Sequence, residues 1–280
     1  MAGVLTAYAL QQAGLSVVVL EAGRIAGGQT QNTTAKITSQ HGLIYSRLIQ
    51  SFGEETARRY AKANQDAVRA YQDLIDVQGI SCDWEERCAY LYGPDVTVLQ
   101  EEAEAARRLG LPASFTREVS IPIPHDGAVR FEGQAQFHPL KFLKVLADQL
   151  TIYEQSRVLT AEGDLLTTEL GSVQAEHIVF ACHFPFVNFP GMYFARMHQE
   201  RSYVLALQGA PPVDGMFLGV GRDTFSLRTY GELLLLGGGG HRTGENTEGG
   251  QYDLLRRKAR EWFPPEPGDR PLVCPGLHAP

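Results

Sequence analysis

Residues 1–21, MAGVLTAYALQQAGLSVVVLE, decide the fold class, because a helix pattern leads directly into a strand pattern. Apolar side chains such as Val4 and Tyr8 recur at helical spacing, and Gly14 follows as a residue able to end the helix. Residues 17–20, VVVL, then form a short β-branched apolar run, which is typical of a buried parallel strand. The stretch therefore predicts a helix and a parallel strand of an α/β protein.

Two residues of this stretch match the end of a dinucleotide-binding fingerprint. Gly3 stands where the third glycine of G-x-G-x-x-G belongs, 18 residues before the acid Glu21. In that motif the third glycine allows close helix–strand packing, and the acid at the strand end holds a ribose. The first strand and the first two glycines are not in the sequence. We therefore expect an incomplete Rossmann-like unit; an ordinary helix–strand hairpin is the alternative.

Composition bounds the class of protein. The 280 residues are 44% hydrophobic, enough for a substantial core, and the net charge is −7 without a basic cluster. This balance argues against nucleic acid or an anionic membrane as a partner, and no apolar run approaches the roughly 18 residues of a membrane span. The four cysteines show no C-x-x-C spacing, so we expect free thiols, no metal site and a cytoplasmic location.

Further along the chain, helix and strand patterns alternate in blocks. Helices are predicted over residues 53–79, 95–110, 139–150 and 251–263. Residues 82–93 predict two short strands around a turn, and residues 178–181 predict a second buried parallel strand. The stretch GGGGHRTGENTEGG at residues 237–250, which begins with four glycines, is expected to be too flexible to belong to the core.

Several motifs together resemble one family. They are TTAKITSQHGLIY (33–45), GQAQFHPLKFL (133–143), HIVFACHFPF (177–186) and PGMYFARMHQERSYVLAL (190–207). With the first stretch, they resemble the D-amino-acid oxidase superfamily of FAD-dependent oxidoreductases, over roughly residues 2–266. The branch that looks most similar is a group of bacterial enzymes that often carry a C-terminal Rieske iron–sulfur domain.

The resemblance implies an α/β fold in which an incomplete Rossmann-like FAD-binding domain is interleaved with a mainly antiparallel α+β substrate domain. The FAD-binding domain would comprise residues 1–79 and 138–198, and the substrate domain residues 80–137 and 199–249. Residues 250–267 would form a closing helix. We expect the chain to be truncated at both ends relative to the family.

The resemblance also implies site residues. Gly3 would be the packing glycine and Glu21, followed by Ala22, the ribose-binding acid. The remaining FAD contacts would be Thr34, Ala35 and Lys36 in the polar loop, Val158 at the adenine, and Ala181 and Cys182 beside the pyrophosphate. Arg228 resembles the position that binds a substrate carboxylate, a task suited to the forked guanidinium.

Plainer interpretations stand beside these assignments. Lys36 is alternatively a solvated loop lysine, and we expect Cys182 to be a small buried side chain without chemistry. His41 and His241 are expected to be hydrogen-bonded structural residues, so no general base is named.

The function that the resemblance implies is oxidation of an amine or amino acid at a C–N bond with hydride transfer to FAD. The partners would be a small-molecule substrate and, in the intact gene, a Rieske domain. One alternative is a non-catalytic fragment that binds FAD weakly or not at all. Another is an NAD(P)-dependent dehydrogenase built on the same helix and strand.

The C-terminal tail departs from the family pattern. Synonymous codons for residues 268–280, read one base later, give VTARWSAPDCMP, which resembles the continuation found in the family. We therefore expect residues 268–280 to be an out-of-frame tail.

Overall fold

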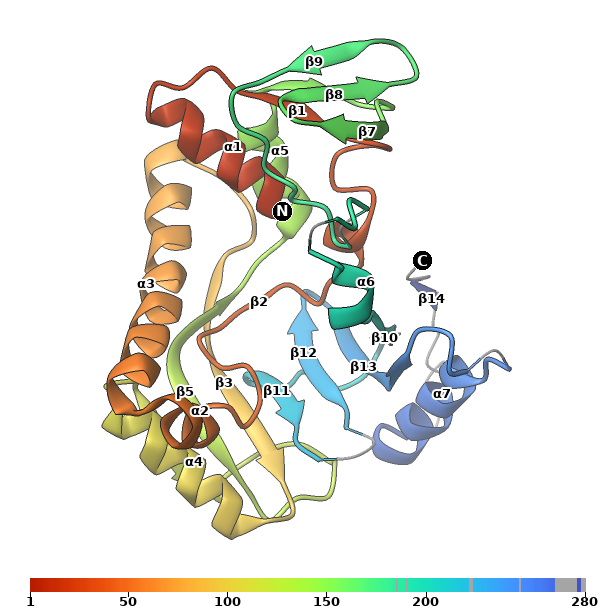
Figure 1. The fold of residues 1–280 in the computed structure, drawn as a ribbon. Coiled ribbons are helices and arrows are strands. Elements are labelled where there is room, and N and C mark those ends of the chain that lie inside the picture. Colours follow the sequence, from red (N-terminus) through yellow and green to blue (C-terminus); the bar gives the residue numbers. More distant parts are fainter. Residues whose placement is uncertain (185, 190, 222–223, 247, 265–275, 278–280) are drawn as a thin grey trace.

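The computed structural model describes residues 1–184, 186–189, 191–221, 224–246, 248–264 and 276–277, and Figure 1 shows their arrangement. The helices are α1 (Ala2–Gln12), α2 (Tyr45–Phe52), α3 (Glu54–Gln78), α4 (Val96–Arg108), α5 (Pro139–Ala147), α6 (Tyr193–Arg196) and α7 (Gln251–Trp262), with the 3-10 helix η1 (Gln29–Asn32). The strands are β1 (Val18–Leu20), β2 (Lys36–Ile37), β3 (Glu85–Gly93), β4 (Ala113–Thr116), β5 (Gly127–Gln136), β6 (Thr151–Tyr153), β7 (Val158–Glu162), β8 (Leu165–Thr168), β9 (Ser172–Gln174), β10 (Glu200–Gln208), β11 (Met216–Gly219), β12 (Ser226–Tyr230), β13 (Leu233–Arg242) and β14 (Gly276–Leu277).

The described strands form one large sheet and two small ones. The large sheet has the order β14-β10-β13-β12-β11-β3-β5-β2, with β4 on β5, and its pairs are antiparallel except β11 with β3. β1 and β6 form a parallel pair, and β7, β8 and β9 form an antiparallel meander. In Figure 1 the small sheets lie above the large one, with α1 and α5 beside them. The predicted α/β class with a mainly antiparallel second part is confirmed.

The predicted helix and parallel strand of the first stretch are present as α1 and β1. Gly14 follows α1 with φ +86°, a conformation that glycine adopts without strain. The expected burial of the strand is wrong in part, because Val18 is 36% exposed. Within the described residues β1 and β6 have only each other as strand partners, so neither is an interior strand.

The long helix α3 matches the prediction at both ends. Gly53 precedes it with φ +80°, and Gly79 ends it in the left-handed conformation with φ +59°. Its buried stripe includes Ala57, Ala61 and Val68. The charged residues face solvent, where Glu54 and Glu55 pair with arginines one turn later.

The strand predicted over residues 178–181 is wrong. These residues are irregular, and Val179 and Phe180 are 60% and 43% exposed. The apolar run resembled a buried strand, but no described strand lies beside it to supply hydrogen-bond partners.

Two other expectations also fail. Residues 82–93 contain one long strand, β3, because it pairs along its length with β5 and so needs no turn. Gly237–Gly240 lie inside β13. There, a Cβ on Gly238 would be 2.5 Å from the Phe225 ring and one on Gly237 would be 2.6 Å from Ser226 Oγ. Glycine is thus required by close packing at these positions.

Three apolar clusters hold the described residues together. One lies between β3, β5 and the helices α2, α3 and α4, and a second between β10–β13 and α7. The third joins α1, α3 and α5 to β2 and the end of β5, through residues such as Val4, Ile37 and Phe142. This third cluster fixes the helices that surround the candidate site.

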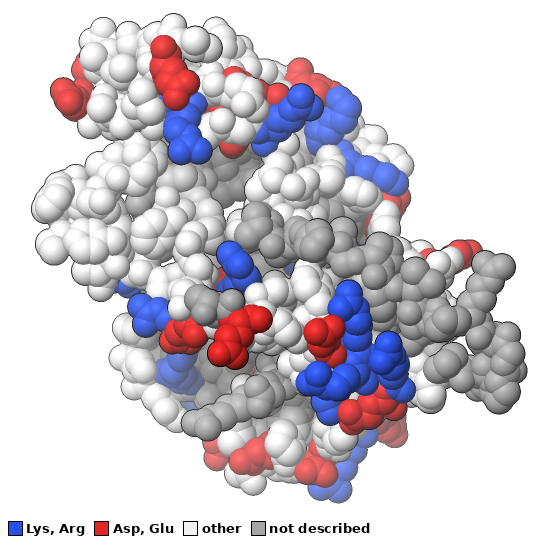
Figure 2. All heavy atoms as spheres, turned by 90° about the vertical axis from the view of Figure 1, so that its right-hand side faces the viewer, with Lys and Arg blue, Asp and Glu red and all other residues white. Residues whose placement is uncertain are grey.

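On the face shown in Figure 2, Lys and Arg side chains lie next to Asp and Glu side chains. No helix among the described residues is long and apolar enough to cross a membrane. The expected out-of-frame tail, residues 268–280, lies outside the described residues apart from β14.

Candidate functional site

A cavity of about 380 Å³ lies where four segments of the chain converge. They are Met1, which precedes α1, the polar loop 29–38, one face of α3 and the start of α5. Its lining residues are Met1, Gln29, Thr30, Thr33, Ala35, Lys36, Ile37, Thr38, Asn64, Ala67, Val68, Tyr71, Phe137 and Pro139. A cavity of this size, with polar groups on one wall and apolar groups on the other, suits a small molecule or cofactor.

The polar loop is held in the cavity wall by its own backbone. Ala35 has φ +49° and is buried, its N–H donates to Thr33 Oγ1 at 3.1 Å, and its carbonyl accepts from Phe137 N–H at 3.4 Å. Immediately afterwards β2 pairs with β5, Lys36 opposite Gln136. Hydrogen bonds therefore fix the loop on both sides of Ala35. Residues held in such a left-handed conformation occur often at ligand sites.

Substitutions at Ala35 test this backbone. Ala35→Val is expected to lower the free energy of unfolding by about 1–2 kcal/mol, because a β-branched side chain disfavours the left-handed region. Ala35→Gly, the matched control, is expected to cost little, because glycine adopts this φ freely. Chemical denaturation of the three proteins measures the difference. Equal stability of the valine and glycine variants would contradict the strained loop.

The start of α1 lies against the segment that contains Ala181. A Cβ placed on Gly3 would be 3.3 Å from Ala181 Cβ, so the glycine permits a close approach there. The N-terminal amino group of Met1 donates to Thr30 Oγ1 at 3.0 Å, which joins the helix start to the polar loop. Gly3 and Ala181, predicted separately, are thus brought together beside the cavity.

Glu21 lies at the end of β1, as predicted. Its Oε1 accepts the Gly23 N–H at 2.7 Å, and the side chain is partly exposed. The neighbouring strand β6 ends similarly, where Glu154 Oε1 accepts the Ile25 N–H at 2.7 Å. Both carboxylates hold the chain that leaves β1.

Glu21 and Glu154 each accept one backbone N–H at 2.7 Å, so a substitution of Glu154 is a matched control for the predicted ribose contact of Glu21. Glu21→Ala is expected to weaken FAD binding about tenfold or more, because a hydrogen bond to a charged group contributes about 1.5–3 kcal/mol. Glu154→Ala loses an equivalent backbone contact and should leave FAD affinity unchanged. Flavin fluorescence titration of both variants measures this. Equal affinities would remove Glu21 from the cofactor site.

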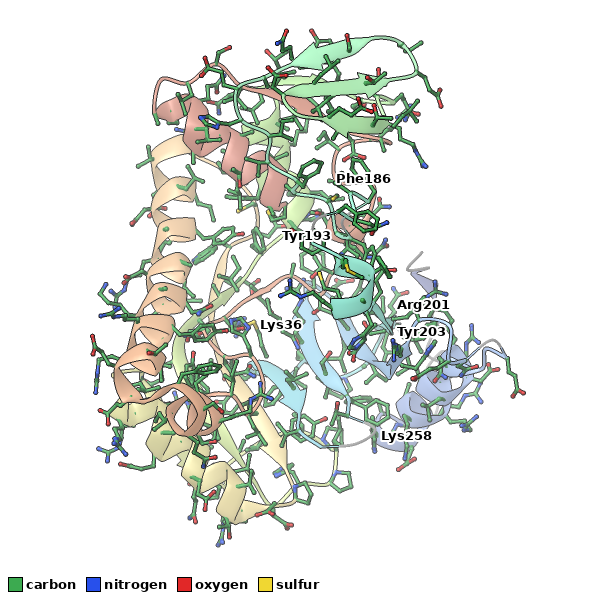
Figure 3. All side chains as sticks on the ribbon, viewed as in Figure 1. Lys36, Phe186, Tyr193, Arg201, Tyr203 and Lys258 are labelled. Atoms are coloured by element: carbon green, nitrogen blue, oxygen red, sulfur yellow. The ribbon has the colours of Figure 1, made fainter. Side chains whose placement is uncertain are left out.

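Lys36 points from the cavity wall toward the large sheet. Its Nζ donates to the carbonyl oxygen of Phe217 on β11 at 2.9 Å, and Figure 3 shows it near the middle of the molecule. Burial, and secondly the nearby Arg228 guanidinium, lower the pKa of Lys36 to about 7. Lys36 is therefore not the solvated loop lysine that the sequence left as an alternative.

Arg228 on β12 is a buried cation, and two of its three guanidinium nitrogens lack hydrogen-bond partners among the described residues. The residue is 4% exposed, and its Nε and NH1 have no partner among the described residues. The guanidinium carbon lies 5.6 Å from the centre of the Tyr230 ring. Burial lowers its pKa to about 10, although Glu85 and Tyr230 act in the opposite direction. An uncompensated buried guanidinium is costly unless it meets an anion.

Glu85, the acid that acts on Arg228, already accepts hydrogen bonds from other side chains. Glu85 Oε2 accepts from Arg87 at 3.2 Å and from Gln136 Nε2 at 2.9 Å. Gln136 Nε2 also donates to the Thr229 carbonyl at 2.8 Å, which brings the ends of β5 and β12 together. Its buried Oε1 has no donor within the described part of the chain. The Arg228 guanidinium can therefore bind an anion, and Gln136 Oε1 is a hydrogen-bond acceptor without a donor in the described structure.

Other predicted residues lie apart from the cavity. Val158 begins β7, Ala22 is exposed after β1, and Thr34 is partly buried in the loop next to Ala35. The expectation that Cys182 is buried is wrong: it is exposed in the irregular segment after Ala181, because no strand forms there. These residues do not line the 380 Å³ cavity.

The two histidines make the local contacts expected of structural residues. His41 Nε2 lies 3.0 Å from Asn64 Oδ1, and His241 Nε2 lies 3.0 Å from the Tyr203 hydroxyl.

Sequence reasoning missed Gln136, Glu85 and Tyr71. Tyr71 lies in the helix predicted over residues 53–79, where an aromatic side chain is expected to pack in the core, yet it lines the cavity. The available signal was the alternation of Gln134 and Gln136 with apolar neighbours in β5, since amide side chains on a buried strand need partners. Glu85 carried no local signal, because its partners lie far along the chain.

Comparisons with known proteins identify the family of the chain. The family model described as DAO, FAD dependent oxidoreductase, matches residues 1–275. The chain is 36% identical over 277 residues to the putative Rieske 2Fe-2S iron-sulfur protein YhfW of Bacillus subtilis (strain 168), covering 92% of this chain and 54% of that protein. It is 25% identical over 195 residues to gamma-glutamylputrescine oxidoreductase of Escherichia coli (strain K12), covering 64% and 46%. The chain spans about half the length of these relatives.

A solved structure shows the same fold. The crystal structure of glycine oxidase from Geobacillus kaustophilus matches with a TM-score of 0.67 at 15% identity, over 94% of this chain and 75% of that one. At this identity the match concerns the fold alone.

Proposed function

The chain belongs to the DAO family of FAD-dependent oxidoreductases, and from this premise we propose that it oxidises an amino acid at its C–N bond. The family assigns FAD as the cofactor, which agrees with the sequence prediction. The observation that carries the substrate proposal is the buried Arg228 guanidinium, whose Nε and NH1 have no partner in the described structure. A substrate carboxylate is the group that this fork pairs with best.

Residues of the cavity wall, together with Gly3 and Glu21 outside it, fit the cofactor in three respects. The orphan N–H groups at the start of α1 favour a phosphate, and Gly3 lets that helix start approach its neighbour closely. Ala35 and Lys36 form a wall of the cavity, while Glu21 lies at the end of the strand after α1. We retain Ala22, Thr34, Val158, Ala181 and Cys182 as predicted cofactor contacts, and the predicted interleaved domains as a proposal.

When bound, FAD supplies the acceptor for the electron pair that leaves the C–N bond. The protein's own part is positioning. Arg228 holds the substrate carboxylate, and Gln136 Oε1, which lacks a donor, accepts a hydrogen from the substrate amino group. Tyr71 and Phe137 form the apolar side of the cavity, which limits the access of water.

A Rieske-type iron–sulfur partner is a second part of the proposal. Its support is the similarity to the putative Rieske 2Fe-2S iron-sulfur protein of Bacillus subtilis, of which this chain covers 54%. In this scheme the electrons leave FAD toward that centre. Oxygen is the alternative acceptor.

Turnover of a substrate panel tests the function. The FAD-loaded protein is mixed with amino acids, with the amines that lack their carboxylate, and with a reducible dye, and ammonia is measured. We expect kcat/KM for an amino acid to exceed that for its decarboxylated amine about tenfold or more. A protein that holds FAD but releases ammonia from none of them would favour the non-catalytic alternative. Dye reduction by NADH or NADPH alone would favour the dehydrogenase.

A further inference from the structure

Lys36 differs from the other four lysines of the chain in its surroundings. The other four each pair with an acid: Lys62 with Asp66, Lys141 with Asp83, Lys144 with Asp148 and Lys258 with Glu261. Lys36 forms no ion pair with a carboxylate in the described structure, and the charged group that acts on it is the cation Arg228. The hydrogen bond and ion pair with Asp83 raise the pKa of Lys141, whereas burial and Arg228 lower the pKa of Lys36 to about 7.

Lys36 lies at the boundary between the cavity and the large sheet. Lys36 lines the 380 Å³ cavity, and one N–H is held by the Phe217 carbonyl at 2.9 Å. A neutral amine that donates one hydrogen in this way keeps its lone pair for another atom. Desolvation next to a second cation is the condition under which lysines act as nucleophiles toward carbonyl compounds.

We propose that Lys36 is a carbonyl-reactive amine that forms a Schiff base with a 2-oxo acid, whose carboxylate lies at Arg228. In the reaction Nζ adds to the carbonyl carbon, the oxygen leaves as water, and a C=N bond replaces the C=O bond. No electrons are transferred and no further reactant is needed. The choice of a 2-oxo acid rests on the proposed function, because amino-acid oxidation followed by imine hydrolysis yields one. The reactivity of Lys36 does not rest on it.

The titratable groups around Lys36 come from several elements. Arg228 on β12 lowers the pKa of Lys36, and Tyr71 of α3 lines the same cavity. Glu85 and Tyr230 act in turn on Arg228. The N-terminal amino group of Met1 lines the same cavity, and burial lowers its pKa too. It is therefore the competing nucleophile, and the test must identify the residue that reacts.

Reductive trapping provides this test. The protein, with and without FAD, is incubated with pyruvate and sodium cyanoborohydride between about pH 6 and pH 9, and peptides are mapped by mass spectrometry. We expect the adduct on Lys36, forming about tenfold or more faster than on Lys141 near neutral pH, with a midpoint near the pKa of about 7. An adduct on the Met1 amine instead, or equal rates at Lys36 and Lys141, would overturn the proposal.

Variants separate the parts of the proposal. Lys36→Arg keeps the cation but cannot form the Schiff base, so the adduct should disappear, whereas Lys141→Arg, the matched control, should leave it. Loss of the Arg228 charge raises the pKa of Lys36 and so slows trapping of any carbonyl compound near neutral pH. Arg228→Met should therefore slow trapping of pyruvate more than trapping of propanal, which has no carboxylate. Equal slowing of both would overturn the carboxylate contact. Because trapping needs no turnover, an adduct on Lys36 in a protein that oxidises no amine would refute the proposed function alone.

Discussion

Arg228→Met is expected to lower kcat/KM for an amino acid about 100-fold or more, since it removes two hydrogen bonds to a carboxylate that contribute about 1.5–3 kcal/mol each. The amine that lacks the carboxylate should be oxidised at an unchanged rate. The variant should unfold at the same temperature as the wild type or higher, because burial disfavours the charged guanidinium in the folded state. Steady-state kinetics and thermal unfolding on the same preparations measure both effects.

Arg130→Met is the matched control on the same sheet. Arg130 lies on β5, is partly exposed, and its Nε donates to Cys88 Sγ at 3.4 Å. Its replacement should leave kcat/KM within about twofold, as surface changes away from a site do. An Arg228→Met protein with wild-type kcat/KM for the amino acid would remove the carboxylate contact from the account.

Glu102→Ala is expected to lower the free energy of unfolding by about 3–5 kcal/mol, the cost of breaking a buried charged network. Glu102 is fully buried in α4, where Oε1 accepts from Ile44 and Tyr45 N–H at 2.9 and 2.7 Å and Oε2 from Ser46 N–H at 3.0 Å. These are orphan N–H groups at the start of α2. Without the carboxylate they are buried and unpaired.

The control for this prediction lies two residues further on. Glu104 is exposed on the same helix and pairs with Arg107 at 2.8 Å, so Glu104→Ala should change the stability by less than about 1 kcal/mol. Denaturant titration of both variants measures the difference. A similar, small effect for both would mean that water replaces the Glu102 carboxylate at the start of α2.

The elements that the sequence predicted well are those fixed by local patterns. α3 is bounded by Gly53 and Gly79, and α7 closes the described chain as expected. Both helices carry amphipathic periodicity over three or more turns, which needs no knowledge of distant partners. A Cβ on Gly3 would lie 3.3 Å from Ala181 Cβ, which is a close approach of the kind its motif requires, and its role at the cofactor stays a prediction.

The predictions failed where distant segments decide the structure. Residues 178–181 have the composition of a buried strand but no neighbouring strand, whereas Gly237–Gly240 have a flexible composition yet fill a crowded position in β13. The same reason explains the incomplete prediction of the site. Lys36 and Phe217 lie 181 residues apart in the sequence, and Gln136 and Thr229 lie 93 apart. The sheet brings these pairs together, so no local sequence pattern could predict their contacts.

Anaerobic reduction of the bound flavin tests the central claim most directly. An amino acid is added to the FAD-loaded protein without oxygen, and the flavin absorbance is followed while ammonia and 2-oxo acid are measured. The account predicts bleaching with one ammonia and one 2-oxo acid for each flavin reduced, and no bleaching by NADH or NADPH. Bleaching by a nicotinamide nucleotide with no response to any amine would contradict oxidation at a C–N bond.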